Sequence, residues 1–504
     1  MSRHAYCFRP LLGLSGLLVT GVLAADENVR ARPNVLFVAI DDLRPSLGCY
    51  GDPMAQTPHI DALAAAARQF NRAYCQQAVC GPSRASLLTG RLPAITRVWH
   101  NRDHFRNALP NVVTLPQLFK NNGYHTQSLG KVFSGDPREE DPQSWSVPAI
   151  LRRDGWRNYA LRESEGRQKK GLAFEAAEVR DDGYTDGKLA NLAVRSLEEL
   201  KSGSKPFFLA VGFFKPHLPF NAPRKYWDLY DPAVFDLTLA NSPVDHAPDV
   251  AYHTHRELGG YTNVPADELV SAEQARQLRH GYYACVSYVD AQVGKLLAAL
   301  ERLKLAEDTI VVLWGDHGFA LGEGRRWCKG TNFELDTRVP FIIRVPNMAK
   351  PGVATEALIE LVDVYPTLAE LARLSPPADL DGRSLVPILS DPETAGRDAV
   401  LSQFPRPFKP ANPETMGYSI RTSTQRYTRW IRWDTRHMIA EELYAYTDPE
   451  STTTRTALLI ERRNVIEDAT HLLVRDQLRA RMDAILAART SATKSGNAPG
   501  ALQK

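Results

Sequence analysis

Three carboxylates follow apolar runs that are far apart in the sequence. Asp41 and Asp42 come directly after the run from Asn34 to Ile40, and Asp316 follows the run from Thr309 to Trp314 after one glycine. Such a cluster would repel itself strongly unless a cation lay within it, and oxygen ligands suit calcium or magnesium. Paired aspartates often only cap a helix, but three convergent carboxylates favour a metal site.

A second reactive candidate is Cys80, which begins the segment CGPSRASLLTG. Pro82 suits the first turn of a helix, so Cys80 is predicted at a helix N-terminus, where amide donors and the helix dipole favour an anion. Arg84 follows one turn later with a permanent positive charge. Taken alone, the segment also fits a buried cysteine that precedes a helix.

The elements that must position these groups are predicted to be buried strands. The runs 34–40, 206–212 and 309–314 are continuous and apolar, which is typical of strands covered on both faces of a mainly parallel sheet. Each runs into polar, titratable residues, and the second leads to Lys215 and His217. Ligands bind at the carboxyl ends of strands in open α/β sheets. We therefore expect an α/β fold with its site at that edge.

The rest of the chain indicates helices and a smaller C-terminal part. Helical spacing predicts helices over 282–303 and 361–374, whereas 221–278 indicates irregular loops. Short strand-like pieces and a helix over about 469–488 predict a small α+β subdomain. The expected divisions are a signal peptide at 1–25, a catalytic domain at 26–398, the C-terminal subdomain at 399–489 and a disordered tail at 490–504.

The N-terminus predicts export. An apolar run from Leu11 to Ala24 with a small-residue cleavage site is typical of a signal peptide and too short for a membrane anchor. Asn-x-Ser/Thr acceptor sites are absent from the sequence, which favours a bacterial periplasm or exterior over a lysosome. The formal net charge is only +3 on 504 residues, so no nucleic-acid partner is expected.

Four further cysteines leave two possibilities open. Cys49, Cys75, Cys285 and Cys328 show no CxxC pair and no zinc-type spacing. They either form disulfides or stay as buried free thiols. The sequence does not choose between these states.

The segment that begins at Cys80 resembles the signature of type I sulfatases, which are formylglycine-dependent. In that family the cysteine of Cys80-x-Pro82-Ser83-Arg84 is oxidised to formylglycine by a maturation enzyme, which would be a partner of this chain. Within the family, the sequence is most similar to the iduronate-2-sulfatase group. The segments that carry this similarity are 39–45, 76–80, 130–133, 215–220 and 316–323.

The resemblance implies an alkaline-phosphatase-like α/β sandwich with a smaller C-terminal domain. It also implies hydrolysis of sulfate monoesters, with the 2-O-sulfate of iduronate or another uronic acid in sulfated glycans as the expected substrate. A thiol that attacked sulfur would form an adduct with no easy route for releasing sulfate. A hydrated aldehyde can attack sulfur with one hydroxyl and expel sulfate with the other. The implied Ca²⁺ ligands are Asp41, Asp42, Asp316, His317 and the formylglycine at Cys80.

The other implied catalytic residues carry positive charge or a mobile proton. Arg84, Lys131 and Lys329 match cationic positions that would meet the oxygens of the transferring sulfuryl group. His217 matches a histidine that contacts the bridging oxygen and protonates the leaving alcohol. With Cys80, these residues form the predicted catalytic set.

Departures from the family pattern affect the base and the sugar. Ser134 stands where related sequences have a histidine that deprotonates the aldehyde hydrate, so we expect His125 or a metal-bound hydroxide to replace it. Phe319 replaces a tryptophan and Gly330 an aromatic residue at positions that face substrate in the relative, so the sugar is expected to differ.

Two other functions fit the same residues. One is a phosphodiesterase or phosphonate monoester hydrolase of the same superfamily, and the other is a glycan-binding protein that has lost turnover. Retention of Cys80, Arg84 and the three aspartates argues against the second alternative.

Overall fold

A computed structural model gives the structure of most of the chain. The described residues are 1–2, 32–134, 136, 138, 140–151, 155–165, 170–235, 237, 242–253, 257–266, 270–409, 412–446 and 460–491. The chain divides into Met1–Arg32 and Pro33–Lys504, and the second unit is the one described below. Residues 3–25 of the predicted signal peptide and 492–504 of the predicted tail lie outside the described residues.

A seven-stranded sheet with the order β11-β2-β10-β7-β1-β5-β3 forms the centre of this unit. β10 is antiparallel to both of its neighbours, whereas every other pair in the sheet is parallel. The predicted mainly parallel sheet is therefore confirmed. The strands are β1 Asn34–Ile40, β2 Arg68–Tyr74, β3 His125–Gly130, β5 Phe207–Phe213, β7 Thr309–Gly315, β10 Arg338–Arg344 and β11 Thr355–Glu360.

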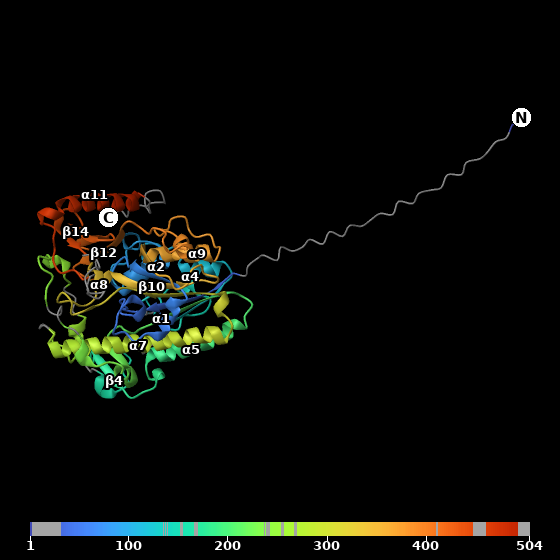
Figure 1. Cartoon of the computed structure of the whole chain (residues 1–504), viewed down its shortest axis with the longest axis horizontal. Helices are drawn as coiled ribbons and strands as arrows, with labels where there is room; N and C mark the ends of the chain where they lie inside the picture. The colour runs from blue at the N-terminus through green and yellow to red at the C-terminus, as the bar shows by residue number, and fades with distance from the viewer. Residues whose placement is uncertain are drawn as a thin grey trace. The chain divides into compact units, whose positions relative to one another are not determined.

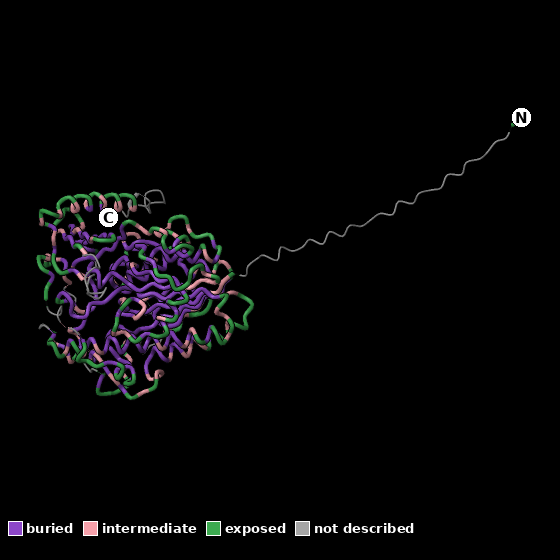
Figure 2. The backbone as a smooth tube through the Cα atoms, viewed as in Figure 1, coloured by how far each residue is buried: buried purple, intermediate pink, exposed green. Residues whose placement is uncertain are grey.

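Helices cover both faces of this sheet, which explains its continuous apolar strands. Alternate residues of β1 enter two different cores: Leu36 and Val38 pack on one face, Val35 and Phe37 on the other. Figure 1 shows the two helical layers, and Figure 2 shows the buried band between them. One layer contains α1 Pro58–Ala65, α5 Thr185–Lys201 and α7 Ala272–Arg302, and the other contains α2 Cys80–Thr89, α4 Leu115–Asn121 and α9 Val364–Leu371.

α7 is longer than its apolar pattern predicts. It begins at Ala272, ten residues before the expected start, and the Ser271 side chain accepts a hydrogen bond from the backbone N–H of Gln274. The expected irregular segment over 221–278 is therefore wrong at its end, because a capped and mostly polar turn precedes the apolar stripe. None of the described helices is both long and apolar enough to span a membrane.

A four-stranded antiparallel sheet and a long helix form the C-terminal part, as expected. Leu478 and Met482 of the helix pack against apolar residues of the sheet. The first strand is joined to the segment before α2, because Gln403 donates its backbone N–H to the carbonyl of Gln76 at 2.8 Å. These elements are β12 Val400–Arg406, β13 Thr415–Arg421, β14 Gln425–Arg432, β15 Met438–Ala445 and α11 Leu472–Ser491, which includes the first two residues of the predicted tail.

The cysteines of the described chain are all free thiols. Cys75, Cys285 and Cys328 are buried and Cys49 is half-buried. Of the two states left open by the sequence, the structure has the unpaired one.

Candidate active site

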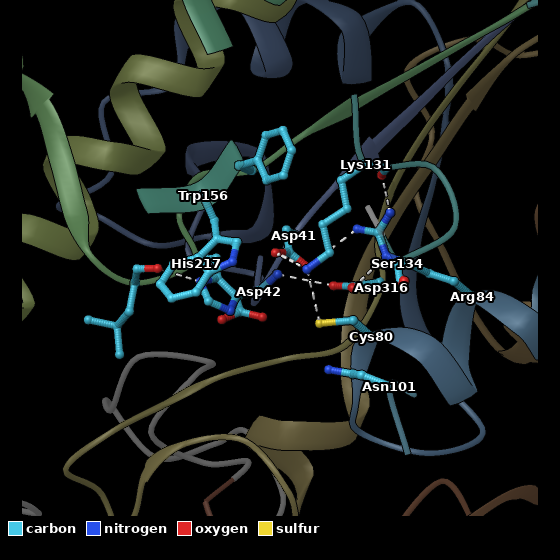
Figure 3. Close-up of polar contacts among 12 residues, drawn as sticks. Asp41, Asp42, Cys80, Arg84, Asn101, Lys131, Ser134, Trp156, His217 and Asp316 are labelled. Atoms are coloured by element: carbon cyan, nitrogen blue, oxygen red, sulfur yellow. Dashed lines mark hydrogen bonds and ion pairs between the residues drawn. The ribbon is translucent and has the colours of Figure 1, made fainter. Parts of the chain in front are cut away.

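The candidate site lies where four neighbouring parallel strands end. Asp41 follows β1, Asp316 follows β7, Lys131 follows β3, and His217 lies four residues after β5. These strands are adjacent in the order β7-β1-β5-β3, so their ends meet at one edge of the sheet. Figure 3 shows the four side chains converging there with Cys80. The predicted residues therefore meet at the predicted edge of the sheet.

Cys80 is the first residue of α2, as predicted, and is only 1% exposed. Its Sγ lies 3.3 Å from Asp41 Oδ1, 3.2 Å from His317 Nε2 and 3.4 Å from Lys131 Nζ. Burial, reinforced by Asp41, raises the pKa of the Cys80 thiol well above its usual value. A neutral thiol is a weak nucleophile, so unmodified Cys80 is poorly suited to attack a sulfate ester.

The buried carboxylates and His317 form a site that fits a divalent cation. Ligand atoms of Asp41, Cys80, Asp316 and His317 all lie within 4.8 Å of one another. Asp42 joins this group, with Oδ1 3.3 Å from His317 Nε2. Burial raises the pKa of Asp42 to about 7 despite the adjacent Lys329. The three carboxylates are fully buried, and the charge of Asp42 is not fully compensated by Lys329. Such a set of oxygen donors fits a hard cation such as calcium or magnesium.

Three cations surround the carboxylates. The Arg84 guanidinium lies 2.8 Å from Asp316 Oδ2 and 3.4 Å from Asp41 Oδ1, with both partners buried. Lys131 Nζ lies 2.6 Å from Asp41 Oδ2. Burial would favour a protonated Asp41, but Lys131, His217 and Arg84 hold its pKa well below the usual value.

Lys329 brings the third charge from a different segment. It follows β9 (Trp327–Cys328), and its Nζ lies 2.8 Å from Asp42 Oδ2. The loop that carries it is fixed by the buried Arg326, which donates to Asp336 Oδ1 at 3.1 Å. The sequence-predicted cations Arg84, Lys131 and Lys329 therefore lie around one carboxylate cluster.

His217 has a partner that the sequence did not indicate. Its Nε2 lies 3.1 Å from Glu257 Oε1, and Glu257 Oε2 lies 3.0 Å from Lys329 Nζ. The Trp156 ring packs against the imidazole with a centroid separation of 5.4 Å. Glu257 lies outside strands and apolar patterns, so no sequence signal could have identified it.

Lys215 and Asp186 hold the loop that carries His217. Lys215 Nζ donates to the carbonyls of His217 at 3.0 Å and Pro219 at 2.6 Å. Asp186, in the first turn of α5, accepts the backbone N–H groups of Phe214 and Lys215 at 2.9 and 2.8 Å. The loop is thus anchored on both sides of the histidine.

Asn101 is a further residue that the sequence did not indicate. Its Oδ1 accepts the backbone N–H of Gly81 at 2.9 Å, immediately after Cys80. Figure 3 shows its side chain beside Cys80. This amide fixes the first turn of α2 and adds a neutral polar group to the site.

The structure corrects one expectation about departures from the family pattern and locates another departure. His125 begins β3 whereas Lys131 follows its other end, roughly 16 Å away along the strand, so His125 is wrong as the replacement base. Phe319 is fully buried and stacks on Tyr282 with centroids 5.5 Å apart. Its ring also borders the site, because Lys329 Nζ lies 5.8 Å from the ring centroid.

Gly330 is the other departure. Its φ is +113°, and a Cβ there would lie 3.5 Å from Cζ of Phe404 and 3.8 Å from His253. Both distances are ordinary van der Waals contacts, so these two rings pack close to the glycine backbone. Gly330 thus lies against Phe404, which comes from the C-terminal sheet.

Comparisons with known proteins agree with this geometry. The sulfatase family model matches residues 33–374, and the model of the N-sulphoglucosamine sulphohydrolase C-terminal region matches residues 322–487. Iduronate 2-sulfatase of Mus musculus is 36% identical over 81% of this chain and 86% of its own length. Iduronate 2-sulfatase of Homo sapiens is 36% identical over 86% of this chain and 92% of its own length.

Solved structures share the fold. The phosphonate monoester hydrolase of Agrobacterium radiobacter superposes with a TM-score of 0.71 at 24% identity, covering 91% of this chain and 96% of that one. At this identity the likeness concerns the fold alone, and the expected alkaline-phosphatase-like sandwich with a C-terminal antiparallel sheet is confirmed. The family model covers most of the chain, and the mouse and human relatives align over most of both sequences. The chain therefore belongs to the sulfatase family and is an enzyme of sulfate ester hydrolysis.

Proposed function

We propose that this sulfatase removes the 2-O-sulfate of iduronate or a related uronic acid in sulfated glycans. The observation that carries the proposal is the convergence of Cys80, three aspartates and three cations at the edge of the sheet, in a chain 36% identical to iduronate 2-sulfatase. A glycan-binding protein without turnover would have no need for so many buried charges, each of which is costly to bury.

The proposed metal ion is calcium, held by Asp41, Asp42, Asp316, His317 and the modified residue at position 80. A bound cation of this kind supplies Lewis acidity and lowers the pKa of a nearby hydroxyl. Carboxylate oxygens dominate this donor set, which supports a hard cation. Lys131 contacts Asp41 and Arg84 contacts Asp316, and these ion pairs hold the two carboxylates in position for it.

The proposed nucleophile is formylglycine made from Cys80 by a maturation enzyme. The hydrated aldehyde supplies both a nucleophilic hydroxyl and a second hydroxyl for release of sulfate. The raised thiol pKa supports this modification, because the unmodified residue would be held in its unreactive form. Arg84, Lys131 and Lys329 are placed to stabilise negative charge on the sulfuryl oxygens.

His217 is the proposed acid for the leaving alcohol. A sugar alkoxide is a poor leaving group, so a proton must reach the bridging oxygen as the S–O bond breaks. The imidazole has one nitrogen within 4.8 Å of carboxylate oxygens of Asp41 and Asp42, which places it at the edge of the proposed metal site. The glycine at position 330, where the resemblance implies an aromatic residue, supports a sugar or linkage that differs from that of the mammalian relatives.

The experiment compares 4-methylumbelliferyl sulfate with a phosphate diester and a phosphonate monoester. The protein is co-expressed with a formylglycine-generating enzyme, modification is verified by mass spectrometry, and Cys80→Ala is the control. Sulfate release that is lost in the control is expected. Preference for either phosphorus substrate would overturn the substrate assignment and favour the phosphodiesterase or phosphonate alternative.

A panel of sulfated disaccharides then tests the sugar. Release from a uronate 2-O-sulfate but not from 4-O- or 6-O-sulfated hexosamines is expected. Turnover of a hexosamine sulfate alone would overturn the proposed sugar while leaving the chemistry intact. The proposed setting is outside the cytoplasm, with residues 1–25 as a signal peptide, 26–398 as the catalytic domain and 399–489 as the C-terminal subdomain.

A further inference from the structure

Glu257 is a buried anion among groups that should attract a negatively charged substrate. It is 8% exposed, and its two oxygens contact His217 and Lys329 at 3.1 and 3.0 Å. An additional negative charge next to a sulfate-binding site weakens anion binding, and a buried carboxylate is costly in itself. We therefore expect Glu257 to have a role that compensates for the weaker anion binding and for the cost of its own burial.

The hydrogen bonds of His217 indicate that role. Nδ1 faces the carbonyl oxygen of Leu218, which can only accept, so this nitrogen carries a hydrogen. Nε2 faces Glu257, whose pKa lies well below its usual value because Lys329 and His217 outweigh the effect of burial. An ionised carboxylate also only accepts, so Nε2 carries a hydrogen as well.

The surroundings of His217 otherwise oppose this protonated state. Burial and the ammonium group of Lys329 lower the pKa of His217 below its usual value, and Glu257 is the strongest of the groups that limit this decrease. Glu257 also balances the charge of Lys329, which would otherwise repel an imidazolium at close range. Removal of the Glu257 charge would therefore favour a neutral imidazole that carries its hydrogen on Nδ1 and none on Nε2.

We propose that Glu257 is a positioning residue that keeps a proton on Nε2 of His217 for delivery to the leaving oxygen. The inference depends on the proposed role of His217 as the acid. In the step, the proposed nucleophilic hydroxyl oxygen at position 80 bonds to sulfur while the S–O bond to the alcohol breaks. The electron pair of the broken bond stays on the leaving oxygen, and the Nε2 proton moves to that oxygen. The alcohol leaves neutral, and a proton from water restores His217.

The test is the leaving-group dependence of kcat/KM for Glu257→Gln, which keeps the size of the side chain and removes its charge. The substrates are aryl sulfates from 4-nitrophenyl to 4-methylphenyl sulfate, whose phenols need increasing assistance from an acid. Positioned acids contribute about 10²–10⁴-fold, so the loss should be at least about tenfold larger for 4-methylphenyl than for 4-nitrophenyl sulfate. Glu199→Gln, an exposed glutamate in α5, is the matched control.

Two further variants keep the test decisive. Glu257→Asp retains the charge and should retain the shallow wild-type dependence, even if Glu257→Gln folds poorly. In a His217→Ala background, Glu257→Gln should no longer change the leaving-group dependence. Equal losses for all phenols, or no loss, would overturn the role of Glu257. Failure of the proposed function would appear separately, as wild-type protein with formylglycine that releases no sulfate.

Discussion

The guanidinium of Arg84 and the carboxylate of Asp316 form a 2.8 Å ion pair in which neither side chain is exposed. Arg84 also donates to the carbonyl of Val132 at 3.1 Å and contacts Asp41. One side chain from α2 thus ties together the ends of β1 and β7 and the segment after β3.

We expect Arg84→Met to destabilise the protein by about 3–5 kcal/mol, because the buried Asp316 would lose its guanidinium partner and Asp41 would keep only Lys131. Urea unfolding followed by circular dichroism measures this change. Arg195→Met, at an exposed position of α5, should stay within about 0.5 kcal/mol of wild type. Equal unfolding midpoints for the two variants would show that the buried pair contributes little.

Removal of divalent cations should lower thermal stability. Asp41, Asp42 and Asp316 are buried together, so a cation that binds only the folded state would stabilise it by about 2.7 kcal/mol at 100 times its Kd. Differential scanning calorimetry after EGTA treatment should show a lower Tm that calcium restores. Asp316→Asn should respond much less to calcium, and a wild-type Tm insensitive to calcium would contradict the proposed site.

Ser134→His should speed the release of sulfate. A serine hydroxyl is a poor base near neutral pH, so release is expected to be the slow half-reaction in wild type. Rapid mixing with 4-nitrophenyl sulfate should then give a burst of phenol before a slower steady phase. The histidine variant should show a smaller burst and a steady rate increased about tenfold or more. A wild-type time course without a burst would mean that another residue already acts as the base.

Acid should weaken the attachment of the C-terminal sheet through Glu334. This buried carboxylate contacts Arg421 Nε at 3.0 Å and Arg426 Nη2 at 2.6 Å. Burial opposes its ionisation, but the two guanidinium groups lower its pKa to about 2, from an ordinary value of 4.5. A lowered pKa in the folded state stabilises the protein above pH 4.5, and this contribution declines as the pH falls towards 2.

The Glu334 contribution corresponds to about 3 kcal/mol in the free energy of unfolding. Urea unfolding of wild type and Glu334→Gln between pH 7 and about pH 2.5 measures it. The difference between the two proteins should be largest at neutral pH and shrink below about pH 4.5. A difference that does not change with pH would exclude this ion cluster as its source.

The sequence indicated the parts of the site that follow regular patterns. β1, β5 and β7 are continuous apolar runs, so their ends and the polar residues after them could be located. The helix at Cys80 could be predicted because Pro82 restricts its first turn. The roles of Lys131 and Lys329 came from the family resemblance, since an isolated lysine has no recognisable pattern.

Contacts between distant loops could not be predicted. Glu257 meets His217 and Lys329 across 40 and 72 residues of sequence, and none of the three lies in a periodic element. Asn101 reaches Gly81 from the loop after α3 (Pro93–Thr96). The prediction for His125 was wrong because the two ends of a strand lie at opposite edges of the sheet. The residue type alone does not indicate which of these edges carries the site.

Because Cys80 is buried in the folded protein, its proposed oxidation must take place before folding is complete. Every residue of α2 is buried, and β12 covers the preceding segment through the bonds of Ser402 and Gln403 to Cys75 and Gln76. β12 begins 320 residues after Cys80 (400 − 80), so at about 5–20 residues per second its synthesis takes roughly 15–65 s. A maturation enzyme that acts on Cys80 as proposed would have this interval, plus the folding time, to reach an accessible thiol. Under this proposal the fraction of modified molecules would be set before folding is complete, and slower translation or folding should increase it.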